Sequence, residues 1–327
     1  MKAFIHTKYG PPEVLKLNDI PVPVPGDKEI LIKIHATTVN RTDNGFLRAD
    51  PFISRFFTGL FRPKNKILGS EFAGQVESTG KDVSLFKAGE KVFGFCEFGA
   101  HAEYISMDEQ VTVATIPENM SFEEAAPLTE GAHYALNNIR RANIRANQKV
   151  LVYGATGAIG SAALQIIKAI GAEVTAVCNT RNLDLIKSLG PDQVIDYTNE
   201  DFTNSNTKYD VVFDAVGKCT FKQCKPFIKE NGIFLSTDLG PYAQNPFLAI
   251  ITSKSKGRKV LFPIPVFNKE MIHYLKDLAQ SGKFKPIIER QYTFEQIPEA
   301  FKYVHTGQKT GNIVISLGKS SGKKGKT

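Results

Sequence analysis

The stretch VLVYGATGAIGSAALQIIKAIGA, residues 150–172, constrains the fold more than any other part of the sequence. An apolar strand is expected up to Gly154, and a helix is expected to follow after a short turn. Ala155, Gly157 and Gly160 then take the three small positions of a GxGxxG phosphate-binding turn. In that turn the first small residue makes the bend, the second admits a pyrophosphate, and the third lets helix pack on strand. The sequence therefore predicts a dinucleotide-binding βαβ unit.

A merely structural glycine turn is the alternative to this interpretation. The apolar segment EVTAVC (173–178) follows the helix where the second strand of a βαβ unit is needed, which favours cofactor binding. The amides at the helix N-terminus would face the anion. The residues of this turn expected to contact the cofactor are Gly154, Ala155, Thr156, Gly157, Ala158, Ile159 and Gly160.

The end of the second strand indicates which cofactor binds. About 20 residues beyond Gly160, an NAD-binding unit carries an Asp or Glu for the ribose. This chain has Asn179, Thr180 and Arg181 there. Neutral donors beside a guanidinium suit a 2′-phosphate, whereas a carboxylate would repel one. NADPH is therefore expected, although Arg181 could instead be a solvated residue at a helix start.

The rest of the chain divides by pattern. Up to about residue 120, β-branched runs broken by Pro and Gly are typical of antiparallel strands, as in 29–39 and 71–79. From Ser121 a capped helix is expected, and then apolar strands alternate with amphipathic helices, which indicates a parallel sheet covered on both faces. A helix is expected near 220–229, a strand at KVLFPIPVF (259–267) and a helix capped by Asn268. The last segment is expected to rejoin the first domain.

Composition excludes several classes of protein. With 327 residues, two domains are expected. The terminal stretch GKSSGKKGKT supplies half of the net charge of +8, so the rest of the chain is only weakly basic and nucleic-acid binding is not expected. Cys96, Cys178, Cys219 and Cys224 lack the spacing of a disulfide scaffold and are expected to be free thiols. No apolar run is long enough for a membrane span, and the start lacks a secretory signal, so a cytoplasmic location is expected.

Several ordered motifs give the chain a family resemblance. These are VNRTD (39–43), LGSEFAGQVESTGKDV (68–83), GEKVFG (89–94), GAHAEY (99–104), the turn at 154–160, FDAVG (213–217) and GNIVI (311–315). Together they resemble the medium-chain dehydrogenase/reductase superfamily, and within it the zinc-free quinone oxidoreductase, or zeta-crystallin-like, branch. The resemblance runs from Met1 to about Leu317.

This resemblance implies an α/β protein with a GroES-like, β-rich catalytic domain and a Rossmann domain with a doubly wound parallel sheet. The expected boundaries are 1–121 with 266–317 for the catalytic domain and 122–265 for the NADPH-binding domain. Residues 318–327 are expected to be a disordered basic tail. The segment 259–265 matches the region through which relatives pair their Rossmann sheets, so a homodimer is expected.

The zinc ligands of the family's alcohol dehydrogenases are replaced in this chain. Asn40 stands where those enzymes carry a cysteine, and Ser70 stands where they carry the histidine of a Gly-His-Glu triplet. An amide and a hydroxyl do not replace Cys and His as zinc ligands. No metal is therefore expected.

Without zinc, hydride transfer to an electron-poor quinone or α,β-unsaturated carbonyl is expected, since such acceptors delocalise the charge themselves. The resemblance implies catalytic roles for Asn40, Thr42, Asp43 and His133, although Asp43 could simply cap a helix. It implies that further cofactor contacts are made by Thr129, Tyr197, Ala215, Val216, Gly217 and Asn312.

The stretch NGFLRADPFISRFF has no tyrosine for proton donation. Its Phe46, Phe52, Phe56 and Phe57 either line an apolar acceptor site or pack the loop. Two other functions stay open: an enoyl-thioester reductase of the same fold, and an NADPH-binding protein with little turnover. The residues do not identify the physiological acceptor, the proton donor or the stereochemistry.

Overall fold

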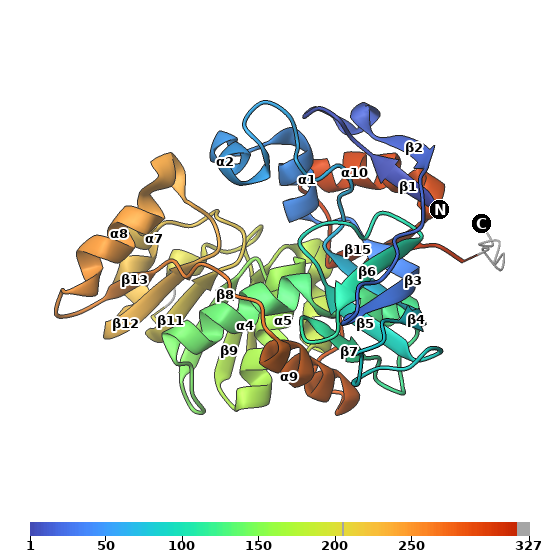
Figure 1. Cartoon of the computed structure of the whole chain (residues 1–327). Helices are drawn as coiled ribbons and strands as arrows, with labels where there is room; N and C mark the ends of the chain where they lie inside the picture. Colours follow the sequence, from blue (N-terminus) through green and yellow to red (C-terminus); the bar gives the residue numbers. More distant parts are fainter. Residues whose placement is uncertain (205, 319–327) are drawn as a thin grey trace, which may run out of the picture. The chain divides into compact units, whose positions relative to one another are not determined.

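The computed structural model describes residues 1–204 and 206–318, which separate into two compact units (Figure 1). The first unit comprises Met1–Thr129, Asn268–Gln280 and the described residues from Ile288. The second comprises Glu130–Phe267 and Ser281–Ile287. Residues 122–129 thus group with the first unit, and 266–267 and 281–287 group with the second, unlike the boundaries expected from the sequence. The basic tail expected at 318–327 lies outside the described residues, apart from Gly318.

The first unit is built on a largely antiparallel sheet. Its strands follow the order β14-β15-β3-β4-β5-β7, and β6 also pairs with β3. The strands are β3 (Glu29–Thr38), β4 (Glu71–Thr79), β5 (Lys91–Phe95), β6 (Tyr104–Asp108), β7 (Val113–Thr115), β14 (Ile288–Thr293) and β15 (Asn312–Ser316), with a separate hairpin of β1 (Lys2–Ile5) and β2 (Lys16–Asp19). Because β15 pairs with β3, the predicted return of the C-terminal segment to the first domain is confirmed.

Two helices of this unit, α3 (Phe122–Ala125) and α9 (Lys269–Gln280), begin at capping residues that the sequence predicts. Its other described helices are α1 (Arg41–Arg48), α2 (Arg55–Thr58) and α10 (Ile297–His305). Ser121 and Glu124 form the capping box predicted for α3. The Asn268 side chain accepts a hydrogen bond of 3.0 Å from the Met271 amide, as predicted for a cap. Both predicted helix starts are therefore confirmed.

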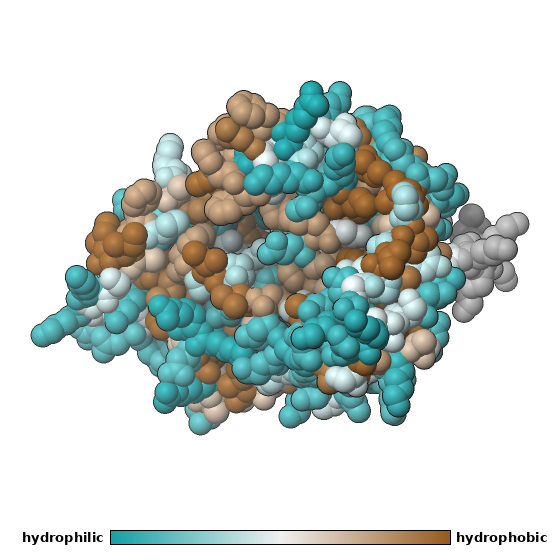
Figure 2. Space-filling model, in the orientation of Figure 1, coloured by the Kyte–Doolittle hydropathy of each residue, from teal (hydrophilic) through white to brown (hydrophobic). Residues whose placement is uncertain are grey.

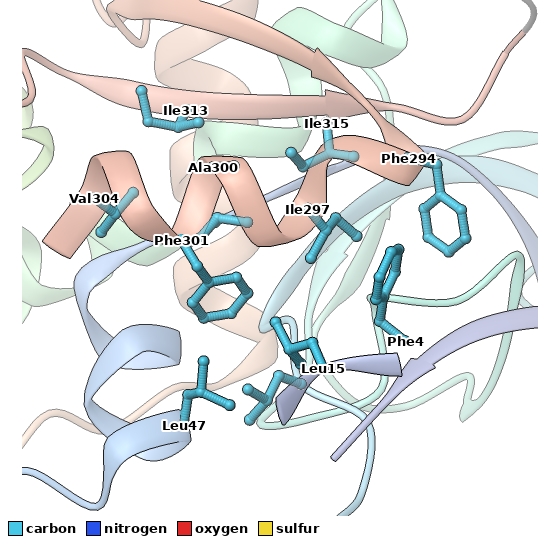
Figure 3. Packing of buried hydrophobic residues seen from close by; sticks show 12 residues of the cluster. Phe4, Leu15, Leu47, Phe294, Ile297, Ala300, Phe301, Val304, Ile313 and Ile315 are labelled. Atoms are coloured by element: carbon cyan, nitrogen blue, oxygen red, sulfur yellow. The ribbon is translucent and has the colours of Figure 1, made fainter. Parts of the chain in front are cut away.

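A buried apolar cluster joins the two ends of the chain within this unit (Figure 3). Phe301 and Ile297 of α10 lie in it beside Leu47 of α1. The rings of Phe4 and Phe294 meet edge to face, with centroids 5.4 Å apart. Helix α10 is amphipathic, and this cluster buries its apolar face, which fixes the C-terminal segment against the N-terminal strands.

The second unit contains a six-stranded sheet with the order β10-β9-β8-β11-β12-β13, in which neighbouring strands run parallel. Its strands are β8 (Lys149–Tyr153), β9 (Glu173–Cys178), β10 (Gln193–Asp196), β11 (Tyr209–Asp214), β12 (Ile228–Ser236) and β13 (Lys259–Leu261). The strand order reverses between β8 and β11. In doubly wound sheets a ligand binds outside the carboxyl ends of the strands at this switch point.

Two sequence predictions in this unit were wrong in extent. The helix expected near 220–229 is only α7 (Phe221–Cys224) and a 3-10 turn, and β12 begins at Ile228. The strand expected at 259–267 ends at Leu261. Prolines explain both differences, because Pro226, Pro263 and Pro265 have no amide hydrogen for a helix or a ladder.

Helices cover the parallel sheet. They are α4 (Glu130–Ala142), α5 (Ala158–Ile170), α6 (Leu183–Ser188), α7 and α8 (Gln244–Ser253). Helices α4 and α5 pack closely, since a Cβ at Gly131 would lie 2.8 Å from the Ala158 backbone. In the two units together, 3-10 turns lie at Pro12–Val14, Phe52–Ser54, Ala126–Leu128, Thr180–Asn182, Phe202–Asn204, Lys225–Phe227, Pro241–Ala243 and Phe294–Gln296. Within the described ranges, no helix has the length and apolarity that crossing a membrane requires.

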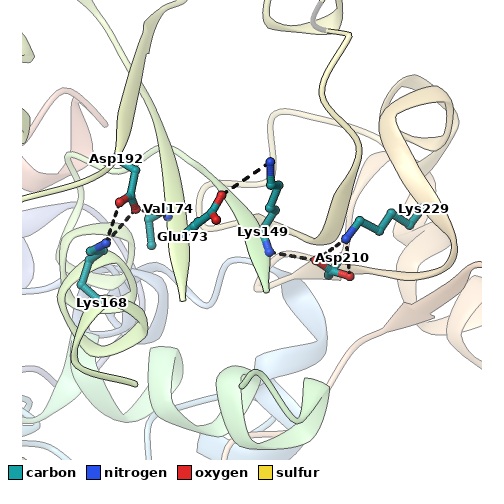
Figure 4. Close-up of polar contacts among 7 residues, drawn as sticks. All are labelled: Lys149, Lys168, Glu173, Val174, Asp192, Asp210 and Lys229. Carbon is teal, nitrogen blue, oxygen red and sulfur yellow. Dashed lines mark hydrogen bonds and ion pairs between the residues drawn. The ribbon is translucent and has the colours of Figure 1, made fainter. Parts of the chain in front are cut away.

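Ion pairs hold the amino ends of the parallel strands together (Figure 4). Asp210 at the start of β11 accepts from the Lys149 amide at 2.8 Å and pairs with Lys229 of β12 at 2.8 Å. Asp192 pairs with Lys168 of α5 at 2.7 Å and also accepts from the Val174 amide. These contacts fix strand register at the edge of the sheet opposite the switch point, which leaves the carboxyl edge for ligand binding.

Candidate active site

The predicted phosphate-binding turn follows β8 in the second unit. Gly154 has a φ of +77°, and a Cβ there would lie 2.6 Å from the Val216 side chain. The bend thus falls at Gly154, where φ is positive, and not at Ala155 as predicted. Ala155 is fully buried, and its amide donates to the Val177 carbonyl at 3.1 Å. A left-handed φ suits a residue without a Cβ, which is the physical reason for this correction.

The other two glycines of the turn differ in their surroundings. A Cβ at Gly160 would lie 2.1 Å from the Gly154 carbonyl oxygen, so the predicted close packing of helix on strand is confirmed. A Cβ at Gly157, the N-cap of α5, would meet nothing nearer than that same oxygen at 3.9 Å. The space beside Gly157 at a helix N-terminus is what a pyrophosphate requires.

The FDAVG turn lies against the glycine turn, at the carboxyl end of β11. The buried carboxylate of Asp214 accepts from the amides of Val216 at 3.1 Å and Gly217 at 2.9 Å. Desolvation by burial raises the pKa of Asp214, although these amides oppose the shift. Asp214 therefore holds the backbone of the predicted cofactor contacts Ala215, Val216 and Gly217. This role of Asp214 was not predicted from the sequence. The available signal was an acidic residue at the end of an apolar strand.

The end of β9 carries the residues predicted to select NADPH. Asn179 accepts from the Asn182 side chain at 2.7 Å, and Arg181 is exposed. The Thr180 hydroxyl donates to Asp196 at 2.6 Å. Asp196, at the end of β10, is a carboxylate near this position that sequence reasoning missed, because counting along one βαβ unit does not reach the next strand.

Four hydrogen-bond donors surround the Asp196 carboxylate. They are the hydroxyl groups of Thr180 and Thr198, the Thr198 amide and the Asn199 side chain. Desolvation by burial raises the pKa of Asp196, but the hydrogen bonds together lower it further, so the net shift is downward. Tyr197 follows it and is exposed, with its ring centroid 6.3 Å from that of Tyr153.

In the first unit, Asn40 and Asp43 form a capping box at the start of α1. The Asp43 amide donates to the Asn40 side chain at 2.8 Å, and the Asn40 amide donates to Asp43 at 3.1 Å. The second oxygen of Asp43 accepts from the Gly69 amide at 3.2 Å. Asp43 thus has the helix-capping role that the sequence left open, and it also ties α1 to the segment before β4.

The Asn40 amide continues into a buried polar cluster. Its Nδ2 donates to Ser70 Oγ at 2.7 Å. Nearby, Cys96 Sγ donates to the Gly69 carbonyl at 3.4 Å. Burial raises the pKa of the Cys96 thiol strongly, and the charges of Asp43 and Glu71 add to the effect. Burial therefore favours the neutral form of the Cys96 thiol.

Glu71, the first residue of β4, is the centre of this cluster. Its carboxylate accepts from the Thr38 hydroxyl at 2.7 Å, the Thr129 amide at 3.0 Å and the Thr129 hydroxyl at 2.8 Å. Thr129, predicted as a cofactor contact, is fully buried and engaged in these bonds. From the sequence, Glu71 stands out only as the last residue of the triplet that replaces Gly-His-Glu, so its role in this cluster was not predicted.

The remaining predicted residues are spread over both units. Thr42 is half-buried on α1, and Asn312 is buried at the start of β15 in the same unit. His133 is buried on α4 of the second unit, with its ring 4.6 Å from that of Phe267. The structure thus gathers Asn40, Asp43 and Thr129 around one buried cluster. It gathers the glycine turn and the FDAVG turn around the switch point.

The four phenylalanines of residues 44–57 do not share one role. Phe46 is half-buried with its ring 5.2 Å from that of Phe98, so this residue packs its loop. Phe52, Phe56 and Phe57 are exposed, so loop packing does not account for them. Across residues 1–204 and 206–318, no three or more His, Cys, Asp or Glu side chains form a group that could hold a metal ion.

Comparison with known proteins places this architecture in a family. A family model described as an alcohol dehydrogenase GroES-like domain matches residues 26–118, and one described as a zinc-binding dehydrogenase matches residues 189–315. A 2-methylene-furan-3-one reductase of Solanum lycopersicum is 33% identical, with 96% of this chain and 79% of that protein aligned. A chloroplastic NADPH-dependent alkenal/one oxidoreductase of Arabidopsis thaliana is 30% identical with the same coverage.

Solved structures agree with this placement. A quinone oxidoreductase of Coxiella burnetii has a TM-score of 0.85 and 30% identity, covering 97% of this chain and 99% of that one. Together, the doubly wound parallel sheet, the β-rich unit and these relatives show that the chain belongs to the medium-chain dehydrogenase/reductase superfamily of oxidoreductases, in its quinone oxidoreductase branch.

Proposed function

We propose that this chain is a zinc-independent, NADPH-dependent oxidoreductase that transfers hydride to a quinone or an α,β-unsaturated carbonyl compound. The observation that carries the proposal is the pair of turns at the switch point, Gly154–Gly160 and Ala215–Gly217, where a Cβ at Gly157 would meet nothing nearer than 3.9 Å. The names of the relatives support the choice of acceptor, since they include an alkenal/one oxidoreductase and a quinone oxidoreductase.

NADPH is supported over NADH by the residues at the end of β9. Arg181 is exposed there and would pair with the 2′-phosphate by charge-assisted hydrogen bonds. The nearby carboxylate of Asp196 is occupied by donors from Thr180, Thr198 and Asn199, so it is not the free ribose acceptor of an NAD-binding unit. The Gly157–Gly160 segment would hold the pyrophosphate.

Zinc, which the family's zinc-binding model implies, does not fit this chain. Asn40 and Ser70, at the positions of the family's Cys and His ligands, are bonded to each other at 2.7 Å. Neither the Asn40 amide nor the Ser70 hydroxyl is a zinc ligand of the usual kind. A reaction that needs no Lewis acid is therefore favoured.

Bound NADPH supplies a hydride, and the protein supplies binding and orientation. Asn40 and Asp43 act mainly as positioning residues, because their hydrogen bonds fix the start of α1. Thr42 on α1 and His133 on α4 stay predicted catalytic residues. Thr129 and Asn312 stay predicted cofactor contacts, and the engagement of Thr129 with Glu71 sets its orientation.

A homodimer is proposed through the edge of the second unit's sheet. Strand β13 is the last strand of this sheet. Beside it lies a cavity of about 970 Å³ whose lining includes Ile250, Val260 and Ile264, together with Arg140 and Arg141. An edge strand beside exposed apolar side chains is a template for pairing with a second copy. The cytoplasmic location expected from the sequence stays a prediction; one relative named above is chloroplastic.

The test is cofactor oxidation by purified, chelator-treated protein. NADPH and NADH are compared with 9,10-phenanthrenequinone, a 2-alkenal and a crotonyl thioester as acceptors. We expect turnover with NADPH and the first two acceptors. Activity restricted to the thioester would favour the enoyl-thioester reductase, and tight NADPH binding without turnover would favour the binding protein. A preference for NADH would contradict the roles given to Thr180 and Arg181.

A further inference from the structure

Residues 52–66, FISRFFTGLFRPKNK, form the surface feature that the proposed reaction leaves unexplained. This segment of the first unit is called the aromatic loop below. Its Phe57 and Phe61 side chains are 79% and 86% exposed. Phe52, Ile53, Phe56 and Leu60 are exposed as well. Figure 2 shows apolar side chains gathered over the segment that Figure 1 labels α2. Monomeric soluble proteins rarely expose a continuous patch of this kind without a partner.

The backbone of the aromatic loop is firmly held. The Tyr9 hydroxyl lies 2.8 Å from Thr58 Oγ1 and donates to the Gly59 carbonyl at 2.6 Å. The Lys64 amide donates to the Thr58 carbonyl at 2.8 Å. Gly59 has a φ of +123°, and a Cβ there would lie 2.1 Å from the Arg62 carbonyl oxygen. The exposed rings are therefore carried by a backbone that hydrogen bonds hold in place.

The charges of the aromatic loop all have one sign. Arg55, Arg62, Lys64 and Lys66 lie within it, and the sequence has no Asp or Glu between Asp50 and Glu71. Arg62, Lys64 and Lys66 are exposed. The Arg55 guanidinium lies over the rings of Tyr9 and Phe52, at 4.9 Å and 5.1 Å from their centroids. Exposed aromatic rings beside cations thus form one amphipathic surface.

We propose that the aromatic loop docks on an anionic lipid surface. Its rings would enter the boundary between headgroups and acyl chains, and its cations would pair with anionic headgroups. Charge complementarity favours this occupant over a second copy of the chain. In a twofold interface built from the aromatic loop alone, both copies would contribute cations and neither would contribute a carboxylate.

The experiment is co-sedimentation of the full chain with vesicles of phosphatidylcholine alone, or of phosphatidylcholine with phosphatidylglycerol. We expect binding to the anionic vesicles only, weakened by added salt. The double variant Phe57→Glu/Phe61→Glu should lower vesicle affinity about tenfold or more, because it removes apolar area and adds negative charge. The variant Arg62→Gln/Lys64→Gln should weaken binding and reduce its dependence on salt.

The matched control is Val22→Glu/Val24→Glu, which places the same charges on exposed valines elsewhere in the first unit. It should bind vesicles like the unchanged chain. Circular dichroism and NADPH binding report whether each variant is folded. The proposal is overturned if the unchanged chain ignores anionic vesicles, or if the control and the aromatic-loop variant lose binding equally. It is also overturned if the aromatic-loop variant binds vesicles normally and only raises KM for the acceptor, since the rings would then serve the acceptor site. Vesicle binding needs no turnover, so this result is independent of the proposed reaction.

Discussion

The glycine turn of the second unit and the buried polar cluster of the first unit are built in opposite ways. The turn is a run of consecutive residues, Gly154–Gly160, and the spacing of its glycines is enough to predict its shape. The cluster joins side chains from Thr38 to Thr129, which meet only because β3 and β4 pair and Thr129 lies against Glu71. The comparison teaches that a backbone-built site can be read from spacing, whereas a site built from side chains depends on which strands pair.

The largest expected effect tests the cluster. Replacing Glu71 with Leu removes the acceptor of three hydrogen bonds from Thr38 and Thr129. We expect the free energy of unfolding to fall by about 3 kcal/mol or more, since each buried donor without a partner costs about 1–3 kcal/mol. Glu77→Leu on the same strand is the control, because Glu77 is exposed. Urea denaturation followed by circular dichroism measures both, and equal losses would contradict the role given to Glu71.

The second effect concerns the pH dependence of the first unit. His101 is fully buried, and its Nε2 lies 2.8 Å from the Thr38 carbonyl oxygen. Desolvation lowers the pKa of His101 to about 4. Between that value and an unfolded pKa of about 6.5, only the unfolded chain binds the proton, so stability falls as the pH falls.

His101 should thus lower stability by about 3 kcal/mol between pH 6.5 and pH 4. The stability advantage of the unchanged chain over His101→Gln should shrink across this interval by that amount. His273→Gln removes an exposed histidine and serves as the control. Denaturation curves at several pH values provide the measurement. Parallel stability profiles for the unchanged chain and His101→Gln would show that His101 is protonated alike in both states.

The third effect tests the glycine turn. Gly160→Ala places a methyl group 2.1 Å from the Gly154 carbonyl oxygen, so we expect a loss of about 1–3 kcal/mol and much weaker NADPH binding. Gly157→Ala meets no such contact and should cost less than about 1 kcal/mol as a change of N-cap. It should still weaken NADPH binding, because its methyl group enters the space proposed for the pyrophosphate. Thermal unfolding and NADPH fluorescence separate the two effects, and normal NADPH binding by both variants would contradict the site.

The smallest effect concerns cofactor choice. Arg181→Ala should raise KM for NADPH about tenfold and leave KM for NADH unchanged, because it removes one charge-assisted contact to the 2′-phosphate. Lys187→Ala removes another exposed cation of the second unit and should change neither value. Steady-state kinetics with both cofactors give the answer. An equal rise for NADPH and NADH would mean that Arg181 does not contact the 2′-phosphate.

Some parts of the fold follow directly from sequence spacing. Ser121 with Glu124, and Asn268, mark helix starts because a cap bonds to amides two or three residues away. The parallel sheet follows from apolar strands that alternate with helices. The start of β12 and the end of β13 were predicted at the wrong residues. The length of a strand depends on its partner strands and on prolines that interrupt the ladder.

What the sequence determined by itself was therefore the local chemistry: the glycine turn, the helix caps, the missing zinc ligands and the alternation of strand and helix. Only the tertiary structure decided what surrounds those residues. In the folded chain Asp196 lies beside Thr180, and Thr129 donates hydrogen bonds to Glu71. The rings of Phe57 and Phe61 stay exposed. The physical reason is range, since backbone conformation depends on neighbours within a few residues, whereas burial and hydrogen-bond partners depend on strands that pair from distant parts of the chain.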